Sequence, residues 1–152
     1  MKKLFYTSLA ALLLPLASFP PAARADNSAT QKIAGTWTFF VTLTGGPPCQ
    51  CIQIGRLHAD GTYDGPANDR QSGDALGIWK QTGPNEMAFA IVQNNIGPDG
   101  SAAGEYSIHG KITLNAGLDH GSGSGTVQLL DKSGKVTSTS GFTLTADKLK
   151  LE

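Results

Sequence analysis

Short turn sequences recur along this chain and divide most of it into segments of similar length. Each turn combines glycine with proline, asparagine or aspartate, the residues that adopt the backbone angles of tight hairpins. They lie at 60–61, 83–85, 97–100, 116–119 and 131–134. The chain holds 19 glycines, all after residue 34, which is roughly twice the usual share. This spacing predicts strands joined by short turns.

The segments between the turns are rich in β-branched and aromatic residues, which favour strands. No window of eleven residues after residue 34 has apolar residues at the spacing of a helical face. We therefore expect an all-β domain with strands at 35–44, 49–58, 62–65, 76–81, 87–94, 104–115, 121–131 and 135–147.

Alternation along the strands predicts which face of each strand is buried. In the first strand, Trp37, Phe39, Val41 and Leu43 fall on one face and threonines fall on the other, with Phe40 as the exception. In the segment 104–115, Tyr106, Ile108, Ile112 and Leu114 lie opposite Glu105, Ser107, His109, Lys111 and Thr113. Each strand thus has one face suited to a core.

Eight strands joined by short turns form an antiparallel meander. A meander of this length tends to close, because closure removes the unpaired edges of the sheet. We predict a single antiparallel up-and-down β-barrel of about eight strands, of the calycin type, and the alternative is a two-sheet β-sandwich. The 152 residues suit one domain of this kind.

The first 25 residues have the pattern of an export signal. Two lysines, Lys2 and Lys3, precede an apolar stretch at 4–19, and Ala23-Arg24-Ala25 is a small-x-small cleavage site. Prolines interrupt the apolar stretch, which argues against a membrane anchor. We predict a cleaved signal peptide at 1–25, an N-terminal lead at 26–34 and the barrel domain at 35–150, with the protein periplasmic or secreted from a bacterium.

Charge and motifs narrow the possible partners. Without Lys2, Lys3 and Arg24, nine basic side chains stand against 12 acidic ones, and no basic cluster occurs. Nucleic acid is therefore not an expected partner, and we expect no stable membrane insertion after cleavage and no cofactor. The motifs of phosphate loops, serine hydrolases and zinc proteases are absent from the sequence.

Cys49-Gln50-Cys51 is the most unusual local motif. In an exported protein, two cysteines suggest a disulfide, although alternate residues of an extended strand lie at the edge of what a disulfide spans. Three interpretations stay open. The pair is structural at the barrel mouth, or it forms a labile redox disulfide, or its thiolates bind a soft metal ion such as Cu(I) or Zn(II).

Gly35-Thr36-Trp37 at the start of the first strand resembles the G-x-W signature of the lipocalins. In that family the indole plugs one end of the barrel beneath a basic side chain from the last strand, a place that Lys148 could take here. The segments 58–62, 77–83 and 125–136 extend the likeness to small exported bacterial barrels of the lipocalin-like and allene-oxide-cyclase-like kinds. The resemblance implies a calycin barrel and transfers no catalytic residue to this chain.

Two principal functions follow from a barrel with an apolar interior. The first is binding of a small hydrophobic molecule in the lumen, by the side chains predicted to line it: Phe39, Met87, Phe89, Ile91, Tyr106 and Ile108. The second is a cyclase or isomerase of the allene-oxide-cyclase-like kind, which steers a hydrophobic substrate by shape. Weaker alternatives are a barrel filled by its own side chains and a redox or metal function of the cysteine motif.

The enzyme hypothesis has three candidate catalytic residues. The candidates are Glu105, Tyr106 and His109. A slip of one residue in the register of 104–115 would turn Glu105, His109 and Lys111 into the lumen and make an acid/base site. In the expected register these three side chains face solvent.

Overall fold

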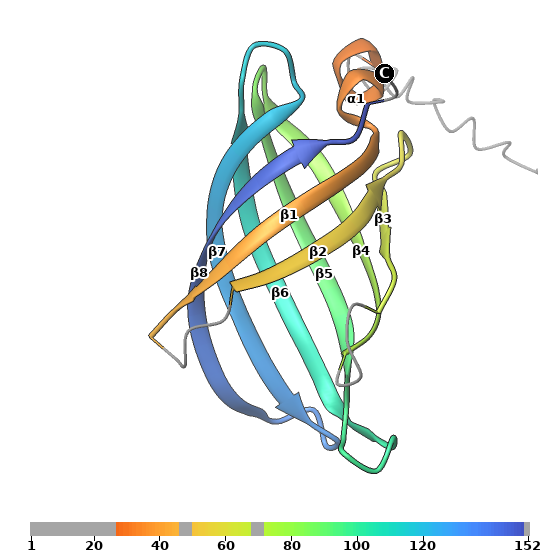
Figure 1. Ribbon diagram of the computed structural model, residues 1–152, viewed down its shortest axis with the longest axis vertical. Coiled ribbons are helices and arrows are strands. Elements are labelled where there is room, and N and C mark those ends of the chain that lie inside the picture. The colour runs from red at the N-terminus through yellow and green to blue at the C-terminus, as the bar shows by residue number, and fades with distance from the viewer. Residues whose placement is uncertain (1–26, 46–49, 68–71, 151–152) are drawn as a thin grey trace, which may run out of the picture.

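The computed structural model describes residues 27–45, 50–67 and 72–150 and shows a closed antiparallel barrel (Figure 1). Each strand pairs with the next one in sequence, and the last strand pairs with the first. The elements are α1 (Asn27–Ile33), β1 (Gly35–Thr44), β2 (Gln50–Leu57), β3 (Thr62–Gly65), β4 (Ser72–Gly83), β5 (Glu86–Ile96), β6 (Ala102–Leu114), β7 (His120–Asp131) and β8 (Val136–Lys148). The predicted up-and-down barrel of eight strands is confirmed, and the alternative sandwich is wrong.

Three of the predicted turns share one hydrogen-bond pattern. The carboxylate of Asp99 accepts from the backbone N–H and the hydroxyl of Ser101, at 3.0 and 2.8 Å. Asp60 with Thr62 and Asp131 with Ser133 repeat the arrangement. These bonds hold the pKa of each aspartate below its ordinary value. The turn residues therefore stabilise the hairpins as their composition predicted.

The glycine- and serine-rich run from Gly121 to Gly125 is a regular part of the barrel. It lies within β7, where the serines face outwards and the glycines face the lumen beside Ile112 and Gly110 of β6. A Cβ atom at Gly123 or Gly125 would come within 2.1 Å of a β6 carbonyl oxygen. These glycines let β7 approach β6 closely, and the ring of Phe142 lies across Gly125.

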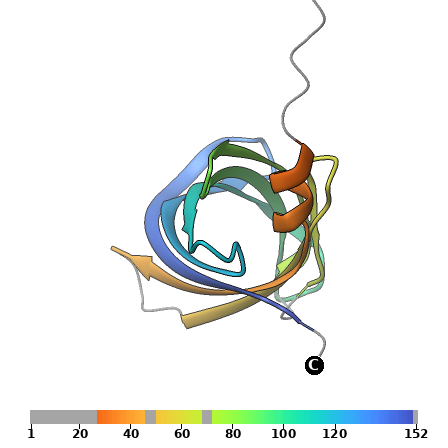
Figure 2. The same cartoon turned by 90° about the horizontal axis from the view of Figure 1, so that it is seen from above.

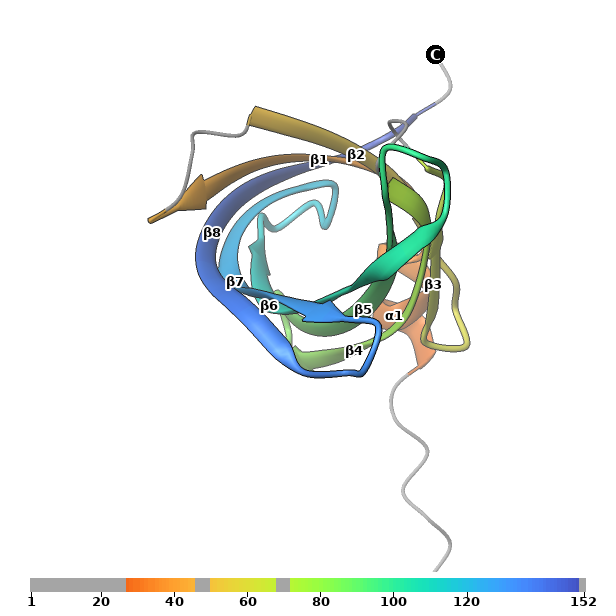
Figure 3. The same ribbon diagram turned by 90° about the horizontal axis from the view of Figure 1, so that it is seen from below.

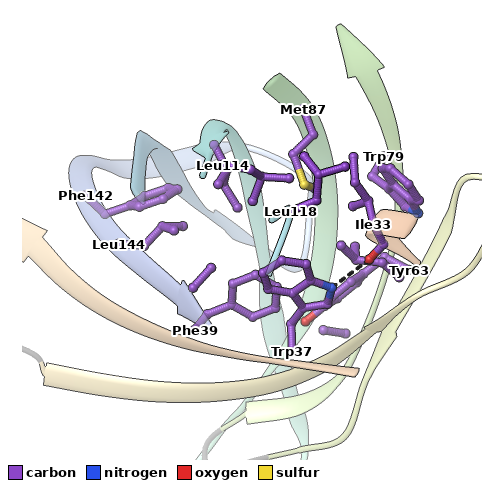
Figure 4. Packing of buried hydrophobic residues seen from close by; sticks show 14 residues of the cluster. Ile33, Trp37, Phe39, Tyr63, Trp79, Met87, Leu114, Leu118, Phe142 and Leu144 are labelled. Atoms are coloured by element: carbon purple, nitrogen blue, oxygen red, sulfur yellow. Dashed lines mark hydrogen bonds between the residues drawn. The ribbon is translucent and has the colours of Figure 1, made fainter. Parts of the chain in front are cut away.

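One end of the barrel is closed around Trp37, which is 1 % exposed. Its indole N–H donates to the carbonyl of Ile33 at 2.9 Å, and its ring stacks on Phe39 (Figure 4). The first strand is thereby tied to α1, which sits over the same end. A second indole, Trp79, is also buried and donates to the carbonyl of His58.

The connection between β6 and β7 completes the closed end. Seen along the barrel, it turns inwards across the opening (Figures 2 and 3). Leu118, at its tip, is buried and has a φ of 56°, a left-handed conformation that costs energy in a residue with a branched side chain. Burial of that side chain among Met87 and Leu114 (Figure 4) offsets the strain.

Lys148 joins three elements at this end. It pairs with Trp37 across the junction of β8 and β1. Its ammonium donates to the carbonyl of Lys32 at the end of α1, a helix terminus that favours a cation. Its stem occupies the space above Gly35, where a Cβ would lie 2.7 Å from Lys148 Cε. Gly35 has a φ of 142°, which requires glycine.

Replacing Trp37 tests the closed end. Trp37→Ala should lower the free energy of unfolding by about 3–5 kcal/mol, because it deletes a large buried ring and leaves a cavity. Phe40→Ala is the matched control, since Phe40 lies on the outer face of the same strand and is 45 % exposed. It should cost about 1 kcal/mol or less. Chemical denaturation measures both. Equally small losses of unfolding free energy in the two variants would contradict the role of Trp37 in closing this end of the barrel.

Candidate functional site

The barrel encloses a cavity of about 620 Å³, within the usual range for small-molecule sites. All eight strands contribute to it: the lining residues are Phe39, Val41, Leu43, Cys51, Ile52, Gln53, Leu57, Tyr63, Ser72, Ala75, Met87, Phe89, Ile91, Gln93, Tyr106, Ile108, Ile112, Val127, Phe142 and Leu144. Within the described residues, side chains therefore do not fill the barrel.

The structure brings all six side chains predicted for the lumen to this one cavity. Phe39 lies on β1, Met87, Phe89 and Ile91 lie on β5, and Tyr106 and Ile108 lie on β6. The strand faces are those expected from alternation. Across the β5–β6 pair, Ile91 lies opposite Ile108 and Gln93 lies opposite Tyr106, so the predicted residues form neighbouring parts of one wall.

The cavity has two chemically different sides. The wall made by β7, β8 and β1 is apolar, with Val127, Phe142, Leu144, Val41 and Leu43. The wall made by β2 to β6 carries uncharged polar groups among its apolar ones: Gln53, Tyr63, Ser72, Gln93 and Tyr106. None of the lining residues that the structure describes is charged. An occupant would meet amides and hydroxyls on one side and hydrocarbon on the other.

Gln93 is the one polar residue of the described core that is buried, at 8 % exposure. Its Nε2 donates to the carbonyl of Gly73 at 3.0 Å. Its Oε1 makes no hydrogen bond within the described residues and is not fully buried. Gln93 itself lines the cavity.

Tyr106 lies directly across from Gln93, on β6. Its hydroxyl donates to Asn95 Oδ1 at 3.3 Å, which leaves the phenolic oxygen as an acceptor. Tyr106 is the only one of the three catalytic candidates that lines the cavity.

Tyr63 is held on the same wall by two glycines. Its ring and hydroxyl occupy the space above Gly55 and Gly65, where a Cβ would lie 2.3 and 2.7 Å from the tyrosine. Burial raises the pKa of Tyr63 to about 12, against a smaller opposing effect of its hydrogen bond with Gln53. Tyr63 therefore stays protonated and neutral at physiological pH.

Glu105 and His109 lie on the outer face of β6, away from the cavity. His109 is exposed, and its ring pairs with the hydroxyl of Ser107 at 3.1 Å. The slipped register that would have turned both side chains inwards does not occur, because Ile108 and Ile112 take the lumen positions of that strand. The acid/base site imagined for that register is therefore absent.

Cys51 lies on β2 opposite Val41, at the edge of the cavity. It is disulfide-bonded, so its sulfur is not a thiolate ligand in this state. The other cysteine of the motif, Cys49, lies outside the described residues. Among the described residues, no group of three side chains is arranged to hold a metal ion.

Sequence reasoning missed the two glutamines of the site, as it missed Tyr63, Phe142 and other lining residues. Gln93 continues the alternation of Met87, Phe89 and Ile91, so the pattern alone placed it on the inner face. Because glutamine is polar, the residues predicted to line the lumen on this strand ended at Ile91. Gln53 shares the inner face of β2 with Leu57.

The raised pKa of Tyr63 predicts a loss of stability at alkaline pH. The pKa of Tyr63 is about 12 in the folded state against an ordinary 10.0. The contribution of the buried neutral tyrosine to the free energy of unfolding is therefore complete below pH 10 and is lost as the pH rises towards 12. The free energy of unfolding should fall by about 2–3 kcal/mol over that range. Tyr63→Phe should lack this part of the decline, and Tyr106→Phe should keep it. Denaturation curves from pH 9 to 12 that are parallel for wild type and Tyr63→Phe would contradict it.

No family model, curated protein or solved structure matches this chain. No helix among residues 27–45, 50–67 and 72–150 is long and apolar enough to cross a membrane. The structure therefore establishes the architecture alone. It is a closed eight-stranded antiparallel barrel, consistent with a calycin-like fold.

Proposed function

We propose that this protein binds a small, mainly apolar molecule in the lumen of its barrel. The observation that carries the proposal is the cavity of about 620 Å³ with its many hydrocarbon and aromatic side chains. Apolar surface of this extent is unfavourable in contact with water and favours an apolar occupant. No charged general acid or base needs to be invoked.

The two ends of the barrel suggest how a ligand enters. Trp37, α1 and the β6–β7 connection cover one end. At the other end, Cys51 and Ile52 line the cavity and are also exposed, Ile52 at 56 %. We infer that the ligand passes this second end and that its innermost part contacts Phe39 and Met87.

The resemblance to lipocalin-like and allene-oxide-cyclase-like barrels supports the same proposal. Trp37 and Lys148 occupy neighbouring positions at the closed end, which is the arrangement that the lipocalin signature implies. Many functions share such barrels, so the argument rests on the cavity more than on the likeness.

A cyclase or isomerase is the second candidate, and the position of Tyr106 favours it. Its hydroxyl is on a residue that lines the cavity, where it would be available to orient a reactive substrate. Native mass spectrometry of protein purified from its own host detects a retained molecule. Chromatography of that molecule before and after incubation distinguishes the two functions, because isomers have the same mass. A retained molecule that stays chemically unchanged on incubation supports binding, and its turnover to an isomer supports catalysis.

Binding of an apolar probe tests the proposed function. N-phenyl-1-naphthylamine is uncharged and fluoresces in apolar surroundings. The protein should bind it, and Phe89→Ala should weaken binding by about 1–3 kcal/mol, because the ring supplies apolar contact inside the cavity. Fluorescence titration measures both. Val92→Ala is the matched control, since Val92 lies on the outer face of the same strand, 44 % exposed, and should bind the probe like wild type.

Variants of the cysteine motif test whether binding depends on the cysteines instead of the lumen. A protein carrying Cys49→Ser and Cys51→Ser should still bind the probe, since the apolar walls are unchanged. A folded double variant that loses all binding, together with a Phe89→Ala variant that binds normally, would move the function from the lumen to the cysteines.

We further propose that the protein acts outside the cytoplasm after removal of residues 1–25, which lie outside the described residues. Expression of the full chain in a bacterium should yield exported protein that begins at Asp26. Intact-mass measurement checks this, and exported protein that retains Met1 would contradict it.

A further inference from the structure

We propose that the cavity selects an uncharged molecule carrying a hydroxyl or carbonyl group, which hydrogen-bonds to Gln93, and that it rejects a carboxylate of the same shape. The inference rests on the proposed function and adds the chemical class of the ligand to it.

The first step is the absence of charge from the described lining of the cavity. Burying a carboxylate without a cationic partner costs several kcal/mol, and no lysine, arginine or histidine of residues 27–45, 50–67 and 72–150 lines the cavity. The charged side chains of β6, namely Glu105, His109 and Lys111, face outwards. Asp131, at the end of β7, accepts hydrogen bonds within its own turn.

The second step is the orientation of the Gln93 amide. The atom that faces the carbonyl of Gly73 has to be the nitrogen, because a carbonyl oxygen only accepts hydrogen bonds. The amide oxygen makes no hydrogen bond within the described residues, and we assign it to the cavity that Gln93 lines. It accepts from a ligand hydroxyl, and the second hydrogen of Nε2 is available to a ligand carbonyl.

The third step is the position of Tyr106. It faces Gln93 across the β5–β6 pair, and its hydroxyl hydrogen is used by Asn95. The phenolic oxygen therefore adds a second acceptor beside the amide. We call Gln93 and Tyr106 the polar pair. The wall formed by β7 and β8 offers only apolar side chains such as Val127 and Phe142. This asymmetry fits a ligand with one polar group on a hydrocarbon body.

Matched neutral and anionic probes test the selectivity. All-trans-retinol and all-trans-retinoic acid differ in a hydroxymethyl against a carboxylate group, as do oleyl alcohol and oleic acid. Each is titrated at pH 8 as a competitor of N-phenyl-1-naphthylamine. At least one alcohol should displace the probe, and it should bind about tenfold or more tightly than its acid, which corresponds to 1.4 kcal/mol or more.

Variants of the polar pair test the assigned contact. Gln93→Leu should weaken binding of the alcohol by about 3- to 10-fold, the usual effect of one hydrogen bond, and leave binding of N-phenyl-1-naphthylamine unchanged. Asn94→Leu is the matched control, because Asn94 is the next residue and is exposed. If Gln93→Leu does not fold, Tyr106→Phe takes its place. It should likewise weaken binding of the alcohol and leave binding of N-phenyl-1-naphthylamine unchanged.

The outcomes separate the inference from the proposed function. If the wild-type protein does not bind N-phenyl-1-naphthylamine, the proposed function is wrong. If it binds this probe and the acids compete as well as their alcohols, or neither alcohol competes, only the selectivity is wrong. Equal alcohol binding by wild type and the folded polar-pair variant would overturn the role of Gln93 and Tyr106.

Discussion

Pairing of the last strand with the first is the interaction on which the rest of this structure depends. From Trp37 opposite Lys148 to Thr44 opposite Gly141, β1 and β8 form a continuous antiparallel ladder. Without it the sheet would have two open edges, and the walls of the cavity would face solvent. The same pairing brings Lys148 to α1 and Gly35, so closure of the sheet and closure of one barrel end are a single structural event.

The polar groups of the lumen are compatible with stability because they form hydrogen bonds with the barrel itself. Gln93 donates to a backbone carbonyl and Tyr106 donates to Asn95. A polar group held in this way avoids most of the free-energy cost of burial. It also keeps a fixed direction, so a ligand would meet hydrogen-bonding atoms that are already oriented.

Much of the fold could be predicted, because turn chemistry and alternation act over a few residues. The strand 35–44 and its inner face follow from the alternation around Trp37 and Phe39, and so do the six lumen residues. What was missed depends on contacts between distant residues. Leu118 adopts its left-handed conformation because the barrel end offers burial, and β4 extends to Ser72 because β5 pairs with it. Trp79, between Ile78 and Lys80, gave no sign of its burial, because the apolar Leu76 and Ile78 alternate onto the opposite, exposed face.

The glycines of the inner face restrict how a barrel of this kind can change its ligand during evolution. At Gly123 and Gly125 a larger residue would collide with the backbone of β6, so the lumen cannot be narrowed there without separating two strands. Phe89 and Phe142, whose rings lie across Gly110 and Gly125, are different. Shortening either ring would widen the lumen while the backbone stayed in place. Adaptation to a bulkier ligand would thus proceed through these aromatic positions.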